Sequence, residues 1–279
     1  NVIADSIISD LNNAISDLPS KSAAPAMRIC KEIAQGFESR VALYEGTWEK
    51  YHQGDPFGVA GQNGSQFLQI AADAANAVMT SGVYGLDYVG QPTAFMSLFN
   101  QTNYSNSREI MWWREYQEGV ITTAWNRYSN TGGGTGMTKR LVDSYLCTDG
   151  LPIAVSPLYK GDDSLLTVVR NRDPRLAQIL DTPGVVLTVE PSGPNAVFTN
   201  PGFTSAADQA CTTGYEMYKG NNTDPEQINY TTRGLTYMRY AEILLNYAEA
   251  KAELGTITQG DLDESINLLR DRVEMPHLI

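Results

Sequence analysis

The segment YMRYAEILLNYAEAKAELG, from Tyr237 to Gly255, decides the fold that this sequence predicts, because every local signal in it agrees. Most of its residues favour helices, and Gly255 stands where a left-handed residue would end one. Polar residues recur at helical spacing and therefore share one stripe: Arg239, Glu242, Asn246, Glu249 and Glu253. The residues expected on another, core-facing side are Tyr237, Ala241, Leu244, Leu245, Ala248 and Ala252. From periodicity alone, a solvated stripe opposite a core stripe is the simplest interpretation.

Three further amphipathic patterns occupy the first part of the chain. A helix over residues 3–18, stopped by Pro19, is predicted from the apolar positions Ala4, Ile7, Ile8, Leu11, Ala14, Ile15 and Leu18. A second helix is predicted from Pro25 to Tyr44, through Met27, Ile29, Ile33, Phe37 and Val41. A third, from about Gln66 to Thr80 and ended by Gly82, buries Phe67, Leu68, Ala71, Ala74, Ala75, Val78 and Met79.

The last pattern has apolar groups at Leu262, Ile266, Leu269 and Val273, and Asp261 with Glu264 is expected to cap its start. These helices suggest tetratricopeptide-type helix pairs split by a long insertion. The fold class is therefore mainly α. The sequence predicts a helical part over 1–81, a loop-rich insertion over 82–234 and a second helical part over 235–279, all in one domain.

The insertion is rich in Gly, Pro, Asn, Ser, Thr and Tyr, and its apolar periodicity fades. Short strands are predicted over 109–116 and 184–190, the second being mostly β-branched. Asp173-Pro174 is a helix-start signal, and the arginines around it are expected to have structural roles. Because loops on a rigid scaffold tend to carry binding groups, we expect the ligand site in this insertion.

The composition excludes several classes of function. A net charge of −12 and a pI near 4.6 argue against nucleic acid and against an anionic membrane surface. Cys30, Cys147 and Cys211 are expected to be packed thiols, and the chain has only two histidines. No apolar run is long enough to span a bilayer. The aspartates at 162, 163 and 173 match no EF-hand, so we assign no metal and no cofactor.

The segment 237–255 also resembles the most recognisable signature of the SusD/RagB family, through Arg239, Ala241-Glu242, Leu245-Asn246 and Ala248-Glu249-Ala250. Other landmarks follow in the order found in that family: Gly132-Gly133-Gly134, the helical TKRLVDSYLCTDG over 138–150, RNRDPRL over 170–176, and Thr213-Gly214-Tyr215 with Lys219. IISDLNNAISDLP and RVALYEGTWEKYH resemble family segments nearer the start of the chain. The likeness covers nearly the whole chain.

This resemblance implies a SusD-like fold and a function. Family members are non-catalytic lipoproteins on the outer-membrane surface of Bacteroidetes-type bacteria, as in the starch utilisation system. They hold oligosaccharides over a SusC-like TonB-dependent transporter, which is the partner expected here. The resemblance also implies a signal peptide, a lipid-attachment cysteine and an early helical segment upstream of this chain, and further residues past Ile279.

A carbohydrate site needs flat aromatic platforms with polar groups at their rims. The stretch MWWREYQEGVITTAWNRYSN, residues 111–130, supplies both. The candidate ligand-binding residues are Trp113, Tyr116, Trp125, Asn126, Arg127 and Tyr128. Trp112 and Trp113 should point to opposite faces of a strand, so Trp125 and Tyr128 are the better platform candidates. An aromatic cluster that only packs loops onto helices is the competing interpretation, and no ligand contact is taken from the resemblance.

Two other functions remain open at this point. A glycoside hydrolase would need two carboxylates about 5 to 9 Å apart, and no motif singles out such a pair. A repeat scaffold that binds only protein, or a family member that captures peptides, would have no sugar affinity. Replacing Trp125 and Tyr128 by alanine separates glycan capture from the protein-binding scaffold, because a scaffold has no sugar binding to lose.

Overall fold

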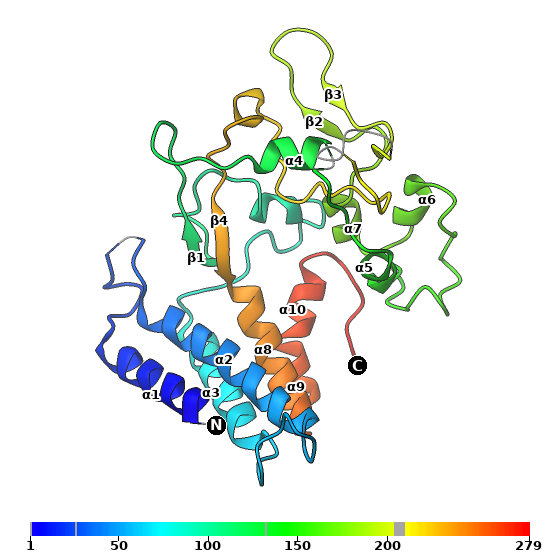
Figure 1. Ribbon diagram of the computed structural model, residues 1–279. Coiled ribbons are helices and arrows are strands. Elements are labelled where there is room, and N and C mark those ends of the chain that lie inside the picture. The colour runs from blue at the N-terminus through cyan, green and yellow to red at the C-terminus, as the bar shows by residue number, and fades with distance from the viewer. Residues whose placement is uncertain (1, 26, 132, 204–209) are drawn as a thin grey trace.

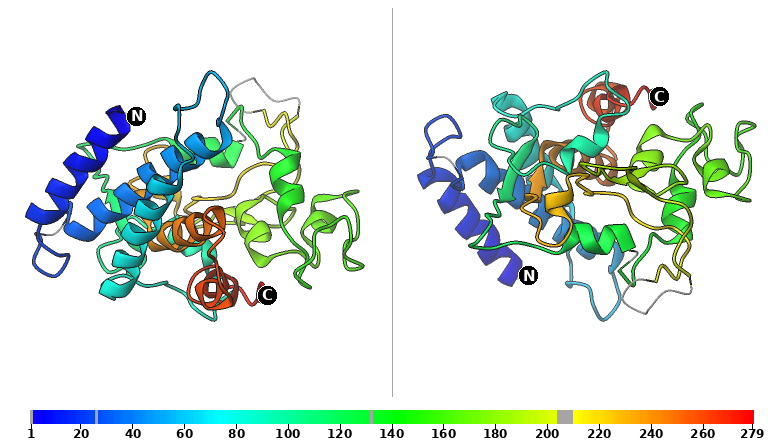
Figure 2. Two further views of the ribbon diagram at one scale, coloured as in Figure 1. Left: turned by 90° about the horizontal axis from the view of Figure 1, so that it is seen from below. Right: turned by 90° about the horizontal axis from the view of Figure 1, so that it is seen from above.

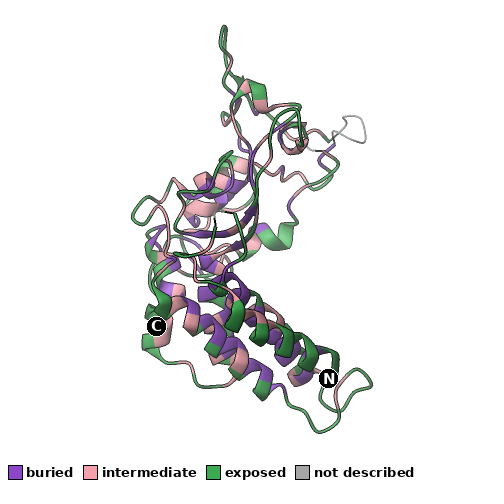
Figure 3. Cartoon of the chain, turned by 90° about the vertical axis from the view of Figure 1, so that its left-hand side faces the viewer, coloured by how far each residue is buried: buried purple, intermediate pink, exposed green. Residues whose placement is uncertain are grey.

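The computed structural model describes residues 2–25, 27–131, 133–203 and 210–279 and is mainly helical, as the sequence predicts. Long helices pack together in the lower part of the molecule, and the loop-rich segment stands over one end of them (Figure 1). Seen from below, α1 lies at the edge of the helices far from the short helices α5–α7 (Figure 2). The buried residues lie on the inner sides of the long helices (Figure 3).

The long helices are α1 (Val2–Asp17), α2 (Lys31–Tyr51), α3 (Ser65–Ser81) and α8 (Tyr240–Glu253). α2 packs on α3 and α1, and α8 packs on α3 and α2. Gly46 allows the close approach of α2 to α3, because an added Cβ would lie 2.8 Å from the backbone nitrogen of Leu68. α3 buries the side that its sequence predicts, with Met79 half-buried and the other six predicted residues buried.

α2 differs from its prediction in its start and in part of its buried side, since Ile33 is buried as predicted whereas Phe37 is exposed. It begins at Lys31 rather than Pro25, because Met27 has a left-handed φ of 61° that a right-handed helix excludes. Its buried side carries small residues such as Ala34 and Ala42, which let α1 and α3 come close. Tyr44, predicted to face the core, is 66% exposed.

α8 begins at Tyr240, later than predicted, because the residues before it form a strand. This strand, β4 (Leu235–Arg239), pairs antiparallel with β1 (Ile110–Arg114), which confirms the strand predicted over 109–116. Tyr237 and Arg239 are therefore strand residues rather than the first turn of the helix. The pair joins the loop-rich segment to the long helices (Figure 1).

The buried side of α8 is partly as predicted. Ala241, Leu244 and Ala248 are buried, whereas Leu245 is 46% exposed. Ala252 is also exposed, and Ile243 and Ala250 take its place in the core. At the end of the helix, Gly255 has a φ of 69° and donates to Ala252, while Thr256 donates to Lys251. These bonds form the left-handed C-terminal cap that the sequence predicts.

The C-terminal pattern forms two short helices, α9 (Gln259–Asp263) and α10 (Ile266–Asp271). The prediction that Asp261 and Glu264 cap its start was wrong. Thr258 is the N-cap, and its side chain and that of Asp261 bond to each other's backbone N–H groups in a capping box. Leu269 and Val273 are buried, as their spacing predicts.

In its described residues, the segment between α3 and β4 contains only short elements. They are η1 (Phe95–Leu98), β1, α4 (Trp125–Thr131), α5 (Lys139–Ser144), α6 (Leu165–Val169), α7 (Pro174–Ile179), β2 (Val186–Thr188), β3 (Ala196–Val197) and η2 (Pro225–Gln227). β2 confirms the second predicted strand. Asp173 caps α7 as predicted, because its carboxylate accepts the backbone N–H of Arg175. A separate apolar cluster, including Phe95, Val142 and Leu176, packs η1, α5, α6 and α7 together.

The three cysteines are buried free thiols, as predicted. In the described ranges, no helix combines the length and apolar character that crossing a membrane requires.

Candidate functional site

A groove of about 610 Å³ runs between the start of α8 and the loops above it. We call it the α8 groove. Its residues are Phe99, Trp125, Met217, Lys219, Gly220, Arg233, the β4 residues Leu235, Thr236, Tyr237, Met238 and Arg239, and Glu242, Leu245, Asn246 and Glu249 of α8. The volume lies in the range of small-molecule sites, about 300–1,000 Å³.

The predicted polar stripe lines this groove except at Glu253, which pairs with Lys50. Glu242, Asn246 and Glu249 all belong to its wall, and Leu245 between them is exposed for the same reason. Asn246 is only 8% exposed, and its side-chain N–H₂ group has no hydrogen-bond partner among the described residues. The stripe therefore gives the groove polar groups at helical spacing.

Trp125, the first residue of α4, forms the loop side of the groove. Its indole N–H donates to the backbone carbonyl of Lys219 at 3.1 Å. Trp125 and Met217 also line a neighbouring cavity of about 170 Å³, together with Tyr128, Ser129, Gly133 and Thr135. One tryptophan therefore separates two cavities.

Phe99 brings cations together at the loop end of the groove. The Lys219 Nζ atom lies 4.1 Å from the centroid of the Phe99 ring, and the Arg239 Cζ atom lies 5.2 Å from it. Arg233 donates from Nη1 to the Phe99 carbonyl at 2.8 Å. The Arg233 guanidinium carbon is also 5.5 Å from the Trp125 ring. Aromatic surface and positive charge are thus adjacent.

Burial lowers the pKa of two of these cations, Lys219 and Arg233, which have no ion-pair partner in the described residues. Desolvation, followed by repulsion from Arg239 and Arg233, lowers the pKa of Lys219 to about 8. Desolvation also lowers the pKa of Arg233, which is 8% exposed. Arg239 is held by Glu109, whose carboxylate is 0% exposed and also accepts from Arg272 at 2.7 Å. This buried network fixes the junction of β4 and α8 at the groove.

The structure brings together some of the residues predicted as ligand contacts. Trp125 and Tyr128 share the smaller cavity, and Tyr128 is 49% exposed. Arg127 is exposed on the same short helix. Asn126 is fully buried, and its side chain bonds to the backbone of Asn222, so it positions the loop rather than reaching the cavity. Of the glycine run, Gly133 lines the cavity, and Gly132 lies outside the described residues.

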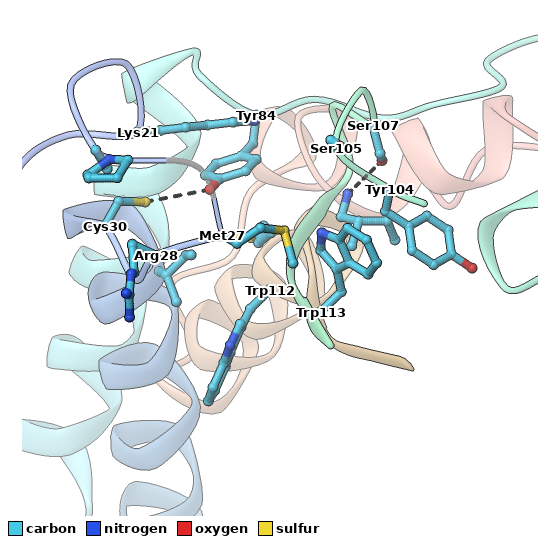
Figure 4. A pocket seen from close by; sticks show the side chains of 15 residues that line it. Lys21, Met27, Arg28, Cys30, Tyr84, Tyr104, Ser105, Ser107, Trp112 and Trp113 are labelled. Atoms are coloured by element: carbon cyan, nitrogen blue, oxygen red, sulfur yellow. Dashed lines mark hydrogen bonds between the residues drawn. The ribbon is translucent and has the colours of Figure 1, made fainter. Parts of the chain in front are cut away.

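Trp113 and Tyr116 lie elsewhere. Trp113 is 8% exposed and packs edge-on against Tyr104, with ring centroids 5.4 Å apart. Trp112 and Trp113 leave β1 in different directions and line a separate pocket of about 180 Å³ (Figure 4). The half-buried Tyr116 ring lies 5.2 Å from the guanidinium carbon of Arg114. Trp113 and Tyr116, both predicted as ligand contacts, therefore do not line the α8 groove.

Sequence reasoning missed Phe99 and Arg233 and gave Lys219 no site role. These residues come from three separate loops, so no local spacing connects them. The arginines of the 170–176 motif are structural where they are buried: Arg172 donates to the carbonyls of Val142 and Tyr145, and Arg175 pairs with Asp173.

Asp181 and Glu216 are two buried carboxylates that repel each other. Burial, followed by repulsion from Glu216, raises the pKa of Asp181 to about 7. Asp181 is 0% exposed and Glu216 is 4% exposed, and neither lines the groove. A sugar cannot reach them in this conformation.

Within the part of the chain that the structure describes, no group of three or more metal-binding side chains occurs.

Comparisons with known proteins agree on one family. The chain is similar to a SusD-like carbohydrate-binding protein of Bacteroides fragilis, with a TM-score of 0.70 and 24% identity over 99% of this chain and 52% of that one. It is also similar to a second SusD-like protein of Bacteroides fragilis, with a TM-score of 0.72 and 23% identity over 99% and 53% of the two chains. For surface glycan-binding protein A of Bacteroides uniformis, the TM-score is 0.56 and the identity 16%, over 99% and 50%.

These likenesses show the fold, and the chain spans about half the length of each of these solved structures. No curated protein matches it. The model of the SusD family matches residues 95–278, which is well over half of the chain and includes β1, α8 and every residue that lines the groove. The chain therefore belongs to the SusD family.

Proposed function

We propose that this protein is a non-catalytic glycan-binding protein of the cell surface, which holds oligosaccharides in the α8 groove and the adjoining cavity. The observation that carries the proposal is the position of Trp125, which forms a wall of both cavities beside Tyr128. Sugar rings present C–H faces that stack on aromatic side chains, while their hydroxyls need polar partners. Glu242, Asn246 and Arg233 supply such partners around the groove.

The relatives support the same class of ligand. One similar structure is a SusD-like carbohydrate-binding protein, and another is a surface glycan-binding protein. The family also supports the remaining parts of the proposal. The protein would be lipid-anchored at the outer-membrane surface and would pass its ligand to a SusC-like TonB-dependent transporter, without breaking a bond in the sugar.

A protein-binding scaffold without sugar affinity, or a family member that captures peptides, is the second candidate. The outer side of α2 favours protein contact, because Tyr44, Trp48, Tyr51 and the nearby Phe57 are 66%, 37%, 68% and 68% exposed. The rings of Tyr44 and Trp48 stack with centroids 6.2 Å apart. Such an exposed aromatic surface is typical of interfaces.

Affinity electrophoresis against a panel of polysaccharides tests the proposal, with the gels also assayed for new reducing ends. Trp125→Ala and Tyr128→Ala should weaken retention of any polysaccharide that the wild type binds, because each removes a flat apolar surface. Trp48→Ala is the matched control, since it removes an exposed tryptophan outside both cavities.

The outcomes separate the candidates. Retention by one class of polysaccharide, without new reducing ends and with loss in the cavity variants, supports capture. If no polysaccharide retains the wild type but the transporter still co-purifies with it, the scaffold function replaces the proposal. Released sugar would overturn the non-catalytic assignment.

A further inference from the structure

The loop end of the α8 groove carries more positive charge than its carboxylates balance. Lys219, Arg233 and Arg239 converge on Phe99, as described above. Among them only Arg239 has an ion-pair partner in the described residues, and that partner, Glu109, is shared with Arg272. The side chains of Lys219 and Arg233 make no ion pair within the described ranges. Arg233 uses Nη1 for the Phe99 carbonyl, and its buried Nε has no partner there.

Of these three cations, only Arg239 is attracted by an acidic residue of the groove, Glu242. Glu242 is bound by Arg40 through two contacts, at 2.5 and 2.7 Å. Glu249 lies almost three helical turns beyond Arg239, on an exposed part of the wall. The charges of Lys219 and Arg233 are therefore not balanced by the carboxylates of the groove.

Unpaired and partly desolvated cations are unfavourable unless something neutralises them. The lowered pKa of Lys219 reflects this cost, because desolvation and two neighbouring guanidinium groups disfavour its charged form. A bound oxyanion would restore the balance, and charge-assisted hydrogen bonds from Lys and Arg to such an anion are strong.

We propose that Lys219 and Arg233, beside Arg239, Phe99 and Trp125, bind the oxyanion of an acidic sugar. The inference rests on the proposed function and specifies its ligand class. Trp125 would face the sugar ring, and the carboxylate or sulfate of that ring would meet the two unpaired cations. Glu242 and Glu249 favour neutral hydroxyls at the other end of the groove, since they would repel a second anion there.

The acidic character of the whole chain does not prevent the groove from binding an anionic sugar. Its net charge is −12, but charges are screened beyond about 8 Å at physiological ionic strength. The local field of the groove is set by the nearest groups, which are cations. The overall charge is expected to slow the approach of an anionic polymer more than it weakens the bound state.

Matched pairs of polysaccharides test the inference without any variant. We would compare the wild-type protein on polygalacturonate and on the same polymer after its carboxyl groups are reduced to alcohols. κ-Carrageenan before and after desulfation forms the second pair, and it separates sulfate from carboxylate recognition. Neutral polysaccharides complete the panel. We expect at least one acidic polymer to bind about tenfold or more tightly than its neutral form.

Charge variants then locate the effect. Lys219→Gln should weaken binding of the acidic polymer about tenfold and bring it close to binding of the neutral form. Lys160→Gln is the control, because it removes the same charge from an exposed side chain outside the groove. Arg233→Gln should act like Lys219→Gln, provided that circular dichroism and thermal melting show it to be folded.

Each outcome is decisive. Equal binding of the acidic and neutral forms, or an unchanged affinity in Lys219→Gln, would overturn the inference while leaving glycan capture intact. If only neutral polysaccharides bind, the inference is likewise overturned and glycan capture is retained. If no polysaccharide binds, the proposed function itself fails, and the inference fails with it.

Discussion

Asn126 and Asn222 hold each other through two hydrogen bonds, although they are almost a hundred residues apart. The Asn126 amide donates to the Asn222 backbone carbonyl at 2.6 Å, and the Asn222 backbone N–H donates to Asn126 Oδ1 at 3.1 Å. The loop that they fix carries Lys219 and Gly220, which line the α8 groove. A buried side chain outside the groove therefore determines the shape of one of its walls.

Asn126→Ala should destabilise the protein by about 1–3 kcal/mol, because the partly buried backbone groups of Asn222 lose their partners. It should also weaken glycan binding, since the loop from Lys219 to Asn222 is no longer fixed. Urea unfolding and affinity electrophoresis measure the two effects. Asn106→Ala, at an exposed position, should change neither. Unaltered glycan binding in a destabilised Asn126→Ala would contradict the positioning role.

Binding of an acidic polysaccharide should decrease as the pH rises from about 7 to about 9. Lys219 has a pKa lowered to about 8 and must be protonated to attract the oxyanion. The other charged groups that line the groove with it are Arg233, Arg239, Glu242 and Glu249. A bound anion favours the ammonium form, so the midpoint of the loss should lie above the pKa of the free protein.

Calorimetric titrations across that pH range would measure this dependence. Lys219→Gln should bind weakly and with little change over the same pH values, whereas Lys160→Gln should follow the wild type. An equal pH dependence in Lys219→Gln would assign the titration to another group.

The predictions from sequence succeeded where structure is local. α3 and its buried side follow from a helical period of small and apolar residues, and the cap at Gly255 follows from a glycine after the last turn. Trp125 and Tyr128 lie three residues apart on one short helix, so their shared cavity is also a local feature.

The predictions failed where contacts between segments distant in the sequence determine the structure. α8 begins at Tyr240 because the residues before it pair with β1, which lies far away in the sequence. The large apolar residues of α2 were used to predict its core side. However, α1 and α3 pack closely on its small residues, such as Ala42. Phe99, Lys219 and Arg233 come together only because three loops pack against one another. Sequence periodicity cannot predict such a contact.

Asp181→Asn should stabilise the protein at about pH 8 and have little effect at about pH 4. Burial raises the pKa of Asp181 to about 7, and both of its carboxylate oxygens have no hydrogen-bond partner in the described part of the chain. Between its unfolded pKa, about 4, and its folded pKa, the folded state binds more protons. The wild type should therefore lose stability as the pH rises through this window, by on the order of 2–4 kcal/mol in total.

Urea unfolding of the wild type and of Asp181→Asn at several pH values checks this sign. The variant should show a flatter profile, while Asp10→Asn, at an exposed position on α1, should keep the wild-type profile. Glu216, which also has a raised pKa from burial, remains in both proteins and contributes a common slope. Identical profiles for Asp181→Asn and the wild type would refute the assignment.

Gly46→Ala should destabilise the packing of α2 on α3 by about 1–3 kcal/mol. The added Cβ would lie 2.8 Å from the Leu68 backbone nitrogen, and a helix backbone cannot move aside as the end of a flexible side chain can. Gly260→Ala in α9 is the control. Its added Cβ has an ordinary contact of 3.7 Å with Thr258, and alanine favours a helix more than glycine does. Thermal melting should therefore show a lower midpoint for Gly46→Ala and an equal or higher one for Gly260→Ala. A shared decrease would mean that loss of glycine, rather than the close contact with α3, is responsible.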